Sequence, residues 1–173
     1  MAEIALRAAR VGEAPDLTAL ARRSKAHWGY DTAFMACCAA ELEVTPQLIE
    51  RSLVRVAEGA GRRLGFVAVT PKEDGRVELD LLFVEPDAVR RGLGRLLVEG
   101  VIEELSGTGA AWIEVASDPN AAPFYRRLGF APAGRVPSGS IPGRSLPLLR
   151  RLLDLRRCSP PEEALPCTVR NTT

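Results

Sequence analysis

Residues 84–97 have the sequence Val84-Glu-Pro-Asp-Ala-Val-Arg-Arg-Gly-Leu-Gly-Arg-Leu-Leu97. The pattern predicts a strand that runs into a loop, followed by a helix that begins at two closely spaced glycines, Gly92 and Gly94. The free backbone N–H groups at a helix N-terminus and the positive end of the helix dipole form an anion site, and glycine lets phosphate oxygens approach the backbone. Three arginines of the same segment add positive charge: Arg90, Arg91 and Arg95. The segment is therefore a candidate phosphate-binding site.

Two familiar nucleotide-binding loops do not match this segment. No Gly-Lys-Ser/Thr follows, which excludes a Walker loop, and the third glycine of a dinucleotide fingerprint is absent. A purely structural interpretation stays open at this point. In that interpretation the glycines only form a tight turn and the arginines face solvent.

The remaining sequence alternates between strand-like and helix-like patterns. Strands are predicted at residues 4–9, 53–58, 64–70, 77–84, 112–116 and 145–153. Helices are predicted at 15–23, from Asp31 to about Leu42, in a short turn after Pro46, from Gly92 to about residue 106, and at 120–128 with Asn120 as N-cap. The stretch before residue 145 is rich in Pro, Gly and Ser and is predicted to be a loop.

The order of these elements predicts an α/β fold, β-α-α-β-β-β-α-β-α-β. The strands from residue 53 to residue 84 should form an antiparallel meander. The strand–helix–strand crossover at 77–116 should make its two strands parallel neighbours. The result is a mixed, mostly antiparallel twisted sheet with helices on both faces. Residues 1–155 are predicted to form a single domain, and the Pro-rich residues 156–173 a loosely ordered tail.

Composition narrows the range of partners and cofactors. The net charge of +1 gives no reason to expect nucleic acid or a membrane as a partner. No apolar run approaches the length of a membrane span, and the N-terminus does not resemble a secretion signal, so a cytoplasmic location is expected. The four cysteines contain no CxxC spacing and His27 is the only histidine, so we expect no metal.

A second motif follows the glycine loop after about twenty-five residues. It is Ser117-Asp-Pro-Asn-Ala-Ala-Pro-Phe-Tyr-Arg-Arg-Leu-Gly-Phe130, with the pattern N-x-x-x-F-Y-x-x-x-G-F. Together the two motifs resemble the GNAT superfamily of acetyl-CoA-dependent N-acetyltransferases, over roughly residues 3–153. The family's pyrophosphate loop, Q/R-x-x-G-x-G/A, corresponds to residues 89–94, where Val89 replaces the usual Gln or Arg.

The resemblance implies a fold, a co-substrate and a set of contacts. The fold would be GNAT-like, and acetyl-CoA would bind along the fourth strand and the glycine loop. The strand should splay from its parallel neighbour, so that backbone N–H groups of Leu82, Phe83 and Val84 bind the pantetheine amides and polarise the acetyl carbonyl. The pyrophosphate segment comprises Val89, Arg90, Arg91, Gly92, Leu93, Gly94 and Arg95. Asn120 would contact the pantetheine arm, and Tyr125 would face the thioester sulfur.

The chemistry would be direct attack by an amine in a ternary complex. Tyr125 is the predicted general acid for the CoA thiolate, and the alternative is that it is a core aromatic side chain. Glu78 is the first choice for the base, because some family members have a catalytic glutamate at this place. Asp80 is the second choice, because strand alternation places it on the same face. The alternatives for this pair are two solvated charges, or a water chain in place of one base.

The acceptor pocket is expected near the segment Ser24–Phe34. His27, Trp28 and Tyr30 could hold a cation or a flat ligand, or could simply pin a loop with buried rings. Arg144 could guide an acceptor carboxylate or face solvent. The aromatic loop favours a small primary amine as the acceptor.

Two other functions stay open. One is a non-catalytic acyl-CoA-binding or sensor domain, and the other is an N-acetyltransferase that acts on proteins or peptides. The expected assembly is a monomer or a homodimer.

Overall fold

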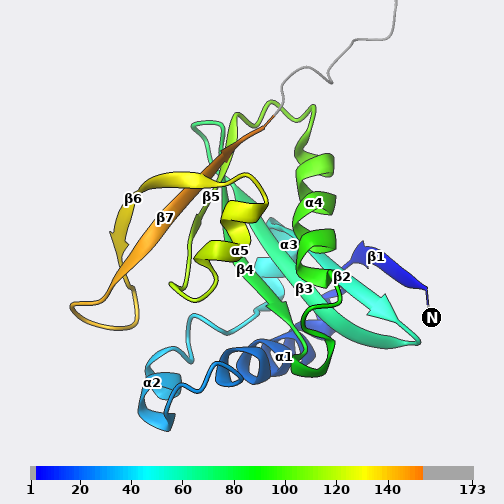
Figure 1. Ribbon diagram of the computed structural model, residues 1–173. Helices are drawn as coiled ribbons and strands as arrows, with labels where there is room; N and C mark the ends of the chain where they lie inside the picture. Colours follow the sequence, from blue (N-terminus) through cyan, green and yellow to red (C-terminus); the bar gives the residue numbers. More distant parts are fainter. Residues whose placement is uncertain (1–2, 154–173) are drawn as a thin grey trace, which may run out of the picture.

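A computed structural model describes residues 3–153 of this chain, which form one seven-stranded sheet in the order β1-β2-β3-β4-β5-β7-β6 (Figure 1). The strands are β1 (Ile4–Ala8), β2 (Leu53–Gly59), β3 (Arg62–Pro71), β4 (Arg76–Val84), β5 (Trp112–Ala116), β6 (Ala131–Pro137) and β7 (Ser145–Leu152). The predicted antiparallel meander is confirmed for β2, β3 and β4. The crossover prediction is also confirmed, because β4 and β5 are parallel neighbours.

Helices cover both faces of the sheet. The first face carries α1 (Ala14–Ala26), α2 (Thr32–Cys37) and α3 (Pro46–Arg51), and the second carries α4 (Leu93–Leu105) and α5 (Ala122–Arg127) (Figure 1). Two short 3-10 turns, η1 (Val11–Glu13) and η2 (Pro86–Ala88), precede α1 and the glycine loop. Each face has its own hydrophobic core. Leu17, Leu20 and Phe66 are buried on the α1 side, and Leu97, Val101 and Ile113 on the α4 side.

The helix starts follow local signals in the sequence. Pro15 lies in the first turn of α1, as predicted. Asp31 and Thr45 are N-caps whose side chains accept hydrogen bonds from the N–H groups of Phe34 and Leu48, which confirms Asp31 as a cap. The amphipathic pattern after Gly92 is likewise confirmed as α4, the longest helix on its face.

Three boundary predictions are wrong. The helix after Asp31 ends at Cys37 instead of near Leu42, because the chain continues as hydrogen-bonded turns. Asn120 is not an N-cap: α5 begins after Ala121, and Asn120 directs its amide to another loop. Part of the predicted loop before residue 145 is the edge strand β6, where prolines are tolerated because one side of the strand needs no hydrogen bonds.

An extra residue interrupts the pairing of β4 with β3. Val69 pairs with Leu79 and Ala68 with Leu81, so Asp80 is the inserted residue of a β-bulge. Before the bulge, Val77 and Leu79 face the α4 core. After it, Leu81 and Phe83 face the α1 core, while Leu82 and Val84 face α4. Asp80 and Leu81 therefore both lie on the α1 side of the sheet.

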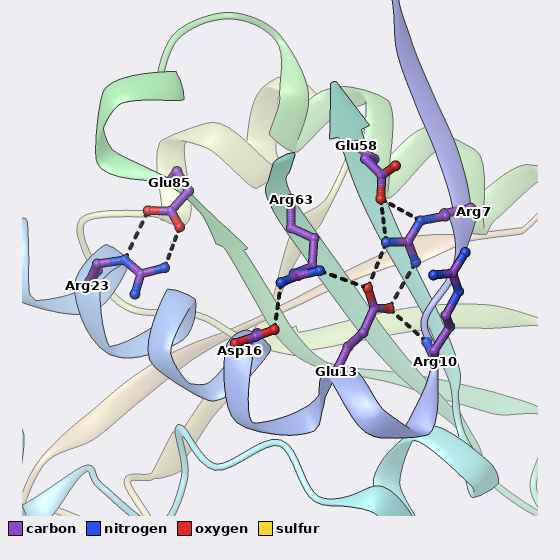
Figure 2. A network of polar contacts seen from close by, with 8 residues as sticks. All are labelled: Arg7, Arg10, Glu13, Asp16, Arg23, Glu58, Arg63 and Glu85. Atoms are coloured by element: carbon purple, nitrogen blue, oxygen red, sulfur yellow. Dashed lines mark hydrogen bonds and ion pairs between the residues drawn. The ribbon is translucent and has the colours of Figure 1, made fainter. Parts of the chain in front are cut away.

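A buried carboxylate ties the first strands to α1, in an arrangement that we call the Glu13 clamp (Arg7, Glu13, Glu58 and Arg63; Figure 2). Glu13 is only 7% exposed. Its two carboxylate oxygens accept hydrogen bonds from Arg7 at 2.7 and 2.9 Å, and Arg63 donates a further bond at 3.2 Å. Arg7 also binds Glu58 across β1 and β2. The clamp thus joins three strands to the start of α1.

Residues 3–153 contain neither a membrane-spanning helix nor a cluster of metal ligands. None of the helices in this range is long and apolar enough to cross a membrane. The same residues contain no cluster of three or more His, Cys, Asp or Glu side chains arranged to hold a metal ion. The predicted tail, 156–173, lies outside the described residues.

Candidate active site

The strand–loop–helix segment leaves a helix N-terminus open to solvent. Gly92 is the N-cap residue of α4, with a φ of 80° in the left-handed region that glycine adopts most easily. No side chain caps this end of the helix, and a Cβ added at Gly92 would meet no atom within 4 Å. The first N–H groups of α4 are therefore free to bind an anion.

The arginine side chains around this N-terminus differ in whether they form ion pairs with other residues. Arg90 and Arg91 are exposed and form no ion pair with another described residue. Arg95 pairs with Glu99 one turn later, at 2.9 Å. Val89 is exposed, and the Leu93 side chain is buried in the core, so of Leu93 only the backbone can contact a ligand. Arg90 and Arg91 are thus the free cations of the predicted set.

Gly94 is needed for a different reason from the one predicted. A Cβ at this position would come within 3.2 Å of the Phe124 ring on α5. The glycine therefore lets α4 pack closely against α5, in addition to any effect on a bound phosphate. This contact links the two sequence motifs in space.

The sheet opens between β4 and β5. The two strands pair only at Arg76, Val77 and Glu78, opposite Trp112, Ile113 and Glu114. From Leu79 to Val84 the edge of β4 that faces β5 has no strand partner, although its other edge pairs with β3. This places Leu82, Phe83 and Val84 along an open backbone edge that leads directly toward the glycine loop. Such an edge offers N–H and C=O groups to the amides of a ligand.

Tyr125 lies on α5, close to this opening. Its ring packs edge-on against Phe124 and Phe130, with centroids at 5.0 and 5.4 Å, and the residue is 5% exposed. Its hydroxyl forms no hydrogen bond with another described residue. Burial raises the pKa of Tyr125 above its ordinary value of 10, so the phenol stays protonated. A neutral phenol without a partner can donate a proton or a hydrogen bond.

A cleft of about 400 Å³ lies on the α1 side of the opening. Both predicted bases, Glu78 and Asp80, line it together with Glu41 and Glu43. Glu78 pairs with Lys72 at 2.9 Å, which makes its carboxylate less available. Asp80 accepts a hydrogen bond from the Thr70 hydroxyl at 2.5 Å.

Asp80 is the better placed of the two bases. Its side chain reaches solvent at the mouth of the cleft, yet the surrounding protein withdraws part of it from water. This burial raises the pKa of Asp80 above its ordinary value of 3.8, although the hydrogen bond from Thr70 opposes the rise. A raised pKa makes a carboxylate a stronger base.

One buried acid beside the site was not predicted. Glu114 on β5 is 6% exposed and lies opposite Glu78. Arg76 donates to it at 2.8 Å and Arg150 at 3.1 Å. Burial would raise the pKa of Glu114, but the bonds from the two arginines outweigh it and lower the pKa. The signal in the sequence is a single charged residue inside the short apolar strand 112–116.

The predicted aromatic cluster is divided by the structure. His27 and Trp28 are exposed at the end of α1, with Trp28 at 54%. Tyr30 turns inward, stacks on Phe34 at 4.1 Å and donates its hydroxyl proton to Asp118 at 2.7 Å. The three residues therefore do not form one aromatic pocket.

Arg144 and Asn120 both reach Tyr30. The Asn120 amide donates to the Tyr30 hydroxyl at 3.1 Å. Arg144 lies 5.0 Å from the Phe34 ring and makes long contacts with Tyr30 and Asp118 at 3.5 and 3.4 Å. Asn120 is thus occupied by a side-chain contact, and Arg144 faces protein as well as solvent.

Curated relatives match part of this chain. An enzyme named [ribosomal protein bS18]-alanine N-acetyltransferase from Salmonella typhimurium is 40% identical over 77 residues, which are 43% of this chain and 52% of that protein. The Escherichia coli K12 enzyme of the same name is 49% identical over 74 residues, or 41% and 50%. Serotonin N-acetyltransferase 2 of Oryza sativa subsp. japonica is 42% identical over 75 residues, or 43% and 38%. The chain spans about half the length or less of these relatives.

Solved structures share the fold over nearly all of the described chain. The PaiA N-acetyltransferase of Thermoplasma acidophilum, solved with coenzyme A, superimposes with a TM-score of 0.73 at 18% identity, covering 87% of this chain and 99% of that one. The Escherichia coli ribosomal-protein-S18-alanine N-acetyltransferase gives a TM-score of 0.65 at 23% identity, covering 87% and 94%.

The family model described as "Acetyltransferase (GNAT) domain" matches residues 26–138, which is more than half of the chain. The match includes the glycine loop, the opening between β4 and β5, and Tyr125. The seven-stranded mixed sheet with helices on both faces agrees with it. The chain therefore belongs to the GNAT acetyltransferase family.

Proposed function

We propose that this chain transfers the acetyl group of acetyl-CoA to a primary amine by direct attack in a ternary complex. The observation that carries the proposal is the unpaired edge of β4, Leu79–Val84, which leads to the free N-terminus of α4. The edge offers backbone groups for the pantetheine amides, and the helix offers N–H groups for the pyrophosphate. The exposed Arg90 and Arg91 supply positive charge beside it.

Bound acetyl-CoA would supply the thioester carbonyl that the amine attacks and the C–S bond that breaks. The backbone N–H groups of β4 polarise that carbonyl. Asp80 takes the proton that the amine loses, directly or through water, with Glu78 as the alternative. Tyr125 gives its hydroxyl proton to the departing sulfur and regains a proton from solvent.

The acceptor enters through the cleft on the α1 side. The cleft is lined by three acids that form no ion pair with a described residue, Glu41, Glu43 and Asp80. Their negative charge attracts cations, and a primary amine is a cation at neutral pH. The volume of about 400 Å³ is within the range of small-molecule sites, which favours a small primary amine.

A protein or peptide amino group is the second candidate. Relatives named for the alanine of a ribosomal protein and for serotonin match over stretches of similar length, at 40–49% and 42% identity, so both acceptor classes deserve a test.

The test has two steps. The midpoint temperature of thermal unfolding should rise when acetyl-CoA is added. At 100 times the dissociation constant, the bound ligand should add about 2.7 kcal/mol to the free energy of unfolding. Thiol release should then be measured with small amines, serotonin among them, and with a peptide that begins with alanine. Binding without thiol release from any amine would favour the acyl-CoA-binding domain, and absence of binding at millimolar acetyl-CoA would overturn the proposal.

A further inference from the structure

One carboxylate at the end of β5, Asp118, receives side chains from three distant segments. Lys25, near the end of α1, contacts its Oδ2 at 2.8 Å, and the Tyr30 hydroxyl donates to the same oxygen at 2.7 Å. Arg144, between β6 and β7, reaches it at 3.4 Å. We call Lys25, Tyr30, Asp118 and Arg144 the Asp118 hub. The Lys25 and Asp118 side chains are only 16% and 18% exposed, so water does little to replace these contacts.

Aromatic rings reinforce the same contacts. The Lys25 ammonium lies 5.0 Å from the centre of the Tyr30 ring, and the Arg144 guanidinium lies 5.0 Å from that of Phe34. Tyr30 and Phe34 stack on each other, so the two cations rest on one aromatic pair. The hub therefore fixes the start of α2 as well as the loop before it.

The segments that meet at the hub also border the acceptor cleft. Pro137 at the end of β6 and Gly139 in the connection that contains Arg144 both line the cleft. Ser140 donates to Glu41, another residue of the lining, at 2.8 Å. The position of Arg144 thus affects one wall of the cleft. The segment that follows α2 supplies Glu41 and Glu43 to the lining, and Glu41 adjoins this connection.

We propose that Asp118 is a positioning residue that holds two loops, residues 27–34 and 138–144, in the arrangement that forms the acceptor end of the site. Without its negative charge, Lys25 and Arg144 would face each other with no carboxylate between them, and the loops would move apart. The inference rests on the proposed function for its catalytic consequence. It differs from the family resemblance, which assigns this segment to the pantetheine arm through Asn120.

Loss of the Asp118 charge should affect the binding of the acceptor and the binding of acetyl-CoA differently. Loss of the Asp118 charge should weaken acceptor binding, because the walls of the cleft lose their fixed positions. Acetyl-CoA binding should change little in Asp118→Asn, because the amide oxygen of the new side chain can still accept the bond that the Asn120 N–H donates at 3.0 Å. A residue that contacted the pantetheine would have the reverse effect.

The experiment compares Asp118→Asn with Glu13→Gln in the full chain, since each replaces an acid that lies between two cations with its amide. Hydrogen exchange of the backbone amides measures how often the two loops open, and it does so without any knowledge of the acceptor. In Asp118→Asn, exchange over 27–34 and 138–144 should accelerate about tenfold or more, while β1–β3 stay protected. Glu13→Gln should show the opposite distribution. Tyr30→Phe, which removes one hydroxyl, should accelerate the same two loops to a smaller extent.

Kinetics and binding complete the test. With serotonin or the alanine peptide, whichever the wild type acetylates, Asp118→Asn should raise the acceptor KM about tenfold, with kcat and the acetyl-CoA Kd nearly unchanged. Unchanged exchange in both loops, or a weakened acetyl-CoA Kd with an unchanged acceptor KM, would overturn the positioning role. Failure of the wild type to bind acetyl-CoA would instead overturn the proposed function and the acceptor role with it.

Discussion

The Glu13 clamp and the Asp118 hub have similar chemistry and different settings. Each places one largely buried carboxylate between two cationic side chains. The cations of the clamp, Arg7 and Arg63, belong to the paired strands β1 and β3 (Figure 2). Those of the hub come from the end of α1 and from a connection between strands. Because strands cannot move without breaking the sheet, we expect the clamp to stabilise the fold and the hub to stabilise a loop conformation.

The largest effect on stability should follow from Glu13→Gln. The variant removes the carboxylate that Arg7 and Arg63 share and leaves them with only Glu58 and Asp16 as partners, so the free energy of unfolding should fall by about 3 kcal/mol. Urea unfolding at neutral pH measures this change. Glu104→Gln, which breaks a pair with Arg55 in which the acid is 39% exposed, is the control and should lower the free energy by less than about 1 kcal/mol. Equal losses in the two variants would show that burial of the Glu13 carboxylate does not increase its contribution to the free energy of unfolding.

Acid should weaken both carboxylate sites, over slightly different ranges. The hydrogen bond from Arg7 outweighs burial and lowers the pKa of Glu13 from about 4.5 to about 2. Burial would raise the pKa of Asp118, but Lys25 and Tyr30 outweigh it and lower the pKa from 3.8 to about 2. Because both pKa values are lower in the folded state, the unfolded state binds more protons as the pH falls. The stabilisation is complete above pH 4.5 for Glu13 and above 3.8 for Asp118, and is lost toward pH 2.

Urea unfolding at a series of pH values from 5 to 2 checks this sign. The wild type should lose stability as the pH falls, and Glu13→Gln should lose less because its amide does not titrate. Asp118→Asn should flatten the curve only below about pH 4. A variant curve parallel to that of the wild type would mean that the replaced carboxylate has an ordinary pKa.

At neutral pH Asp118→Asn should destabilise the protein less than Glu13→Gln. We expect a loss of about 1–2 kcal/mol in the free energy of unfolding, since Lys25 and Arg144 can turn toward water when the loops move. Urea unfolding of the two variants side by side provides the measurement. A loss as large as that of Glu13→Gln would place the hub among the elements that hold the fold together, and the proposed contrast would fail.

Tyr125→Phe should have the smallest effect on stability. The hydroxyl forms no hydrogen bond with a described residue, so its removal should change the free energy of unfolding by less than about 0.5 kcal/mol. Turnover should fall about 100-fold if the phenol is the general acid, with acetyl-CoA binding intact. Tyr30→Phe is the matched control, because it removes a hydroxyl that does have partners and should act on the acceptor KM. Full turnover in Tyr125→Phe would assign Tyr125 to packing alone.

Much of the fold could be predicted because its signals are local. A few neighbouring residues are enough to predict the glycine loop, the amphipathic helix after it and the strand Trp112–Ala116. The strand β6 could not be predicted, because Pro132, Gly134 and Pro137 are acceptable only at a sheet edge, and the sequence does not say where the edge lies.

The site was less predictable, because its contacts join distant residues. Tyr30 and Lys25 meet Asp118 across 88 and 93 residues. Glu114 depends on the register that brings Arg76 and Arg150 beside it. The positions of Gly92 and Tyr125 could be inferred from motifs, but the partners of Asn120 and Arg144 could not.

The bulge at Asp80 inserts one residue into a strand whose side chains alternate between two faces, so it reverses the alternation for the rest of the strand. Every residue of β4 after it is shifted between the inside of one core and the inside of the other. Deleting Asp80 would therefore turn Leu81, Leu82, Phe83 and Val84 to the wrong sides, besides removing a candidate base. An evolving sequence could not discard this residue without repacking both faces of the sheet. Packing alone would thus preserve a residue at position 80, whatever its side chain, even in a descendant that had lost the chemistry.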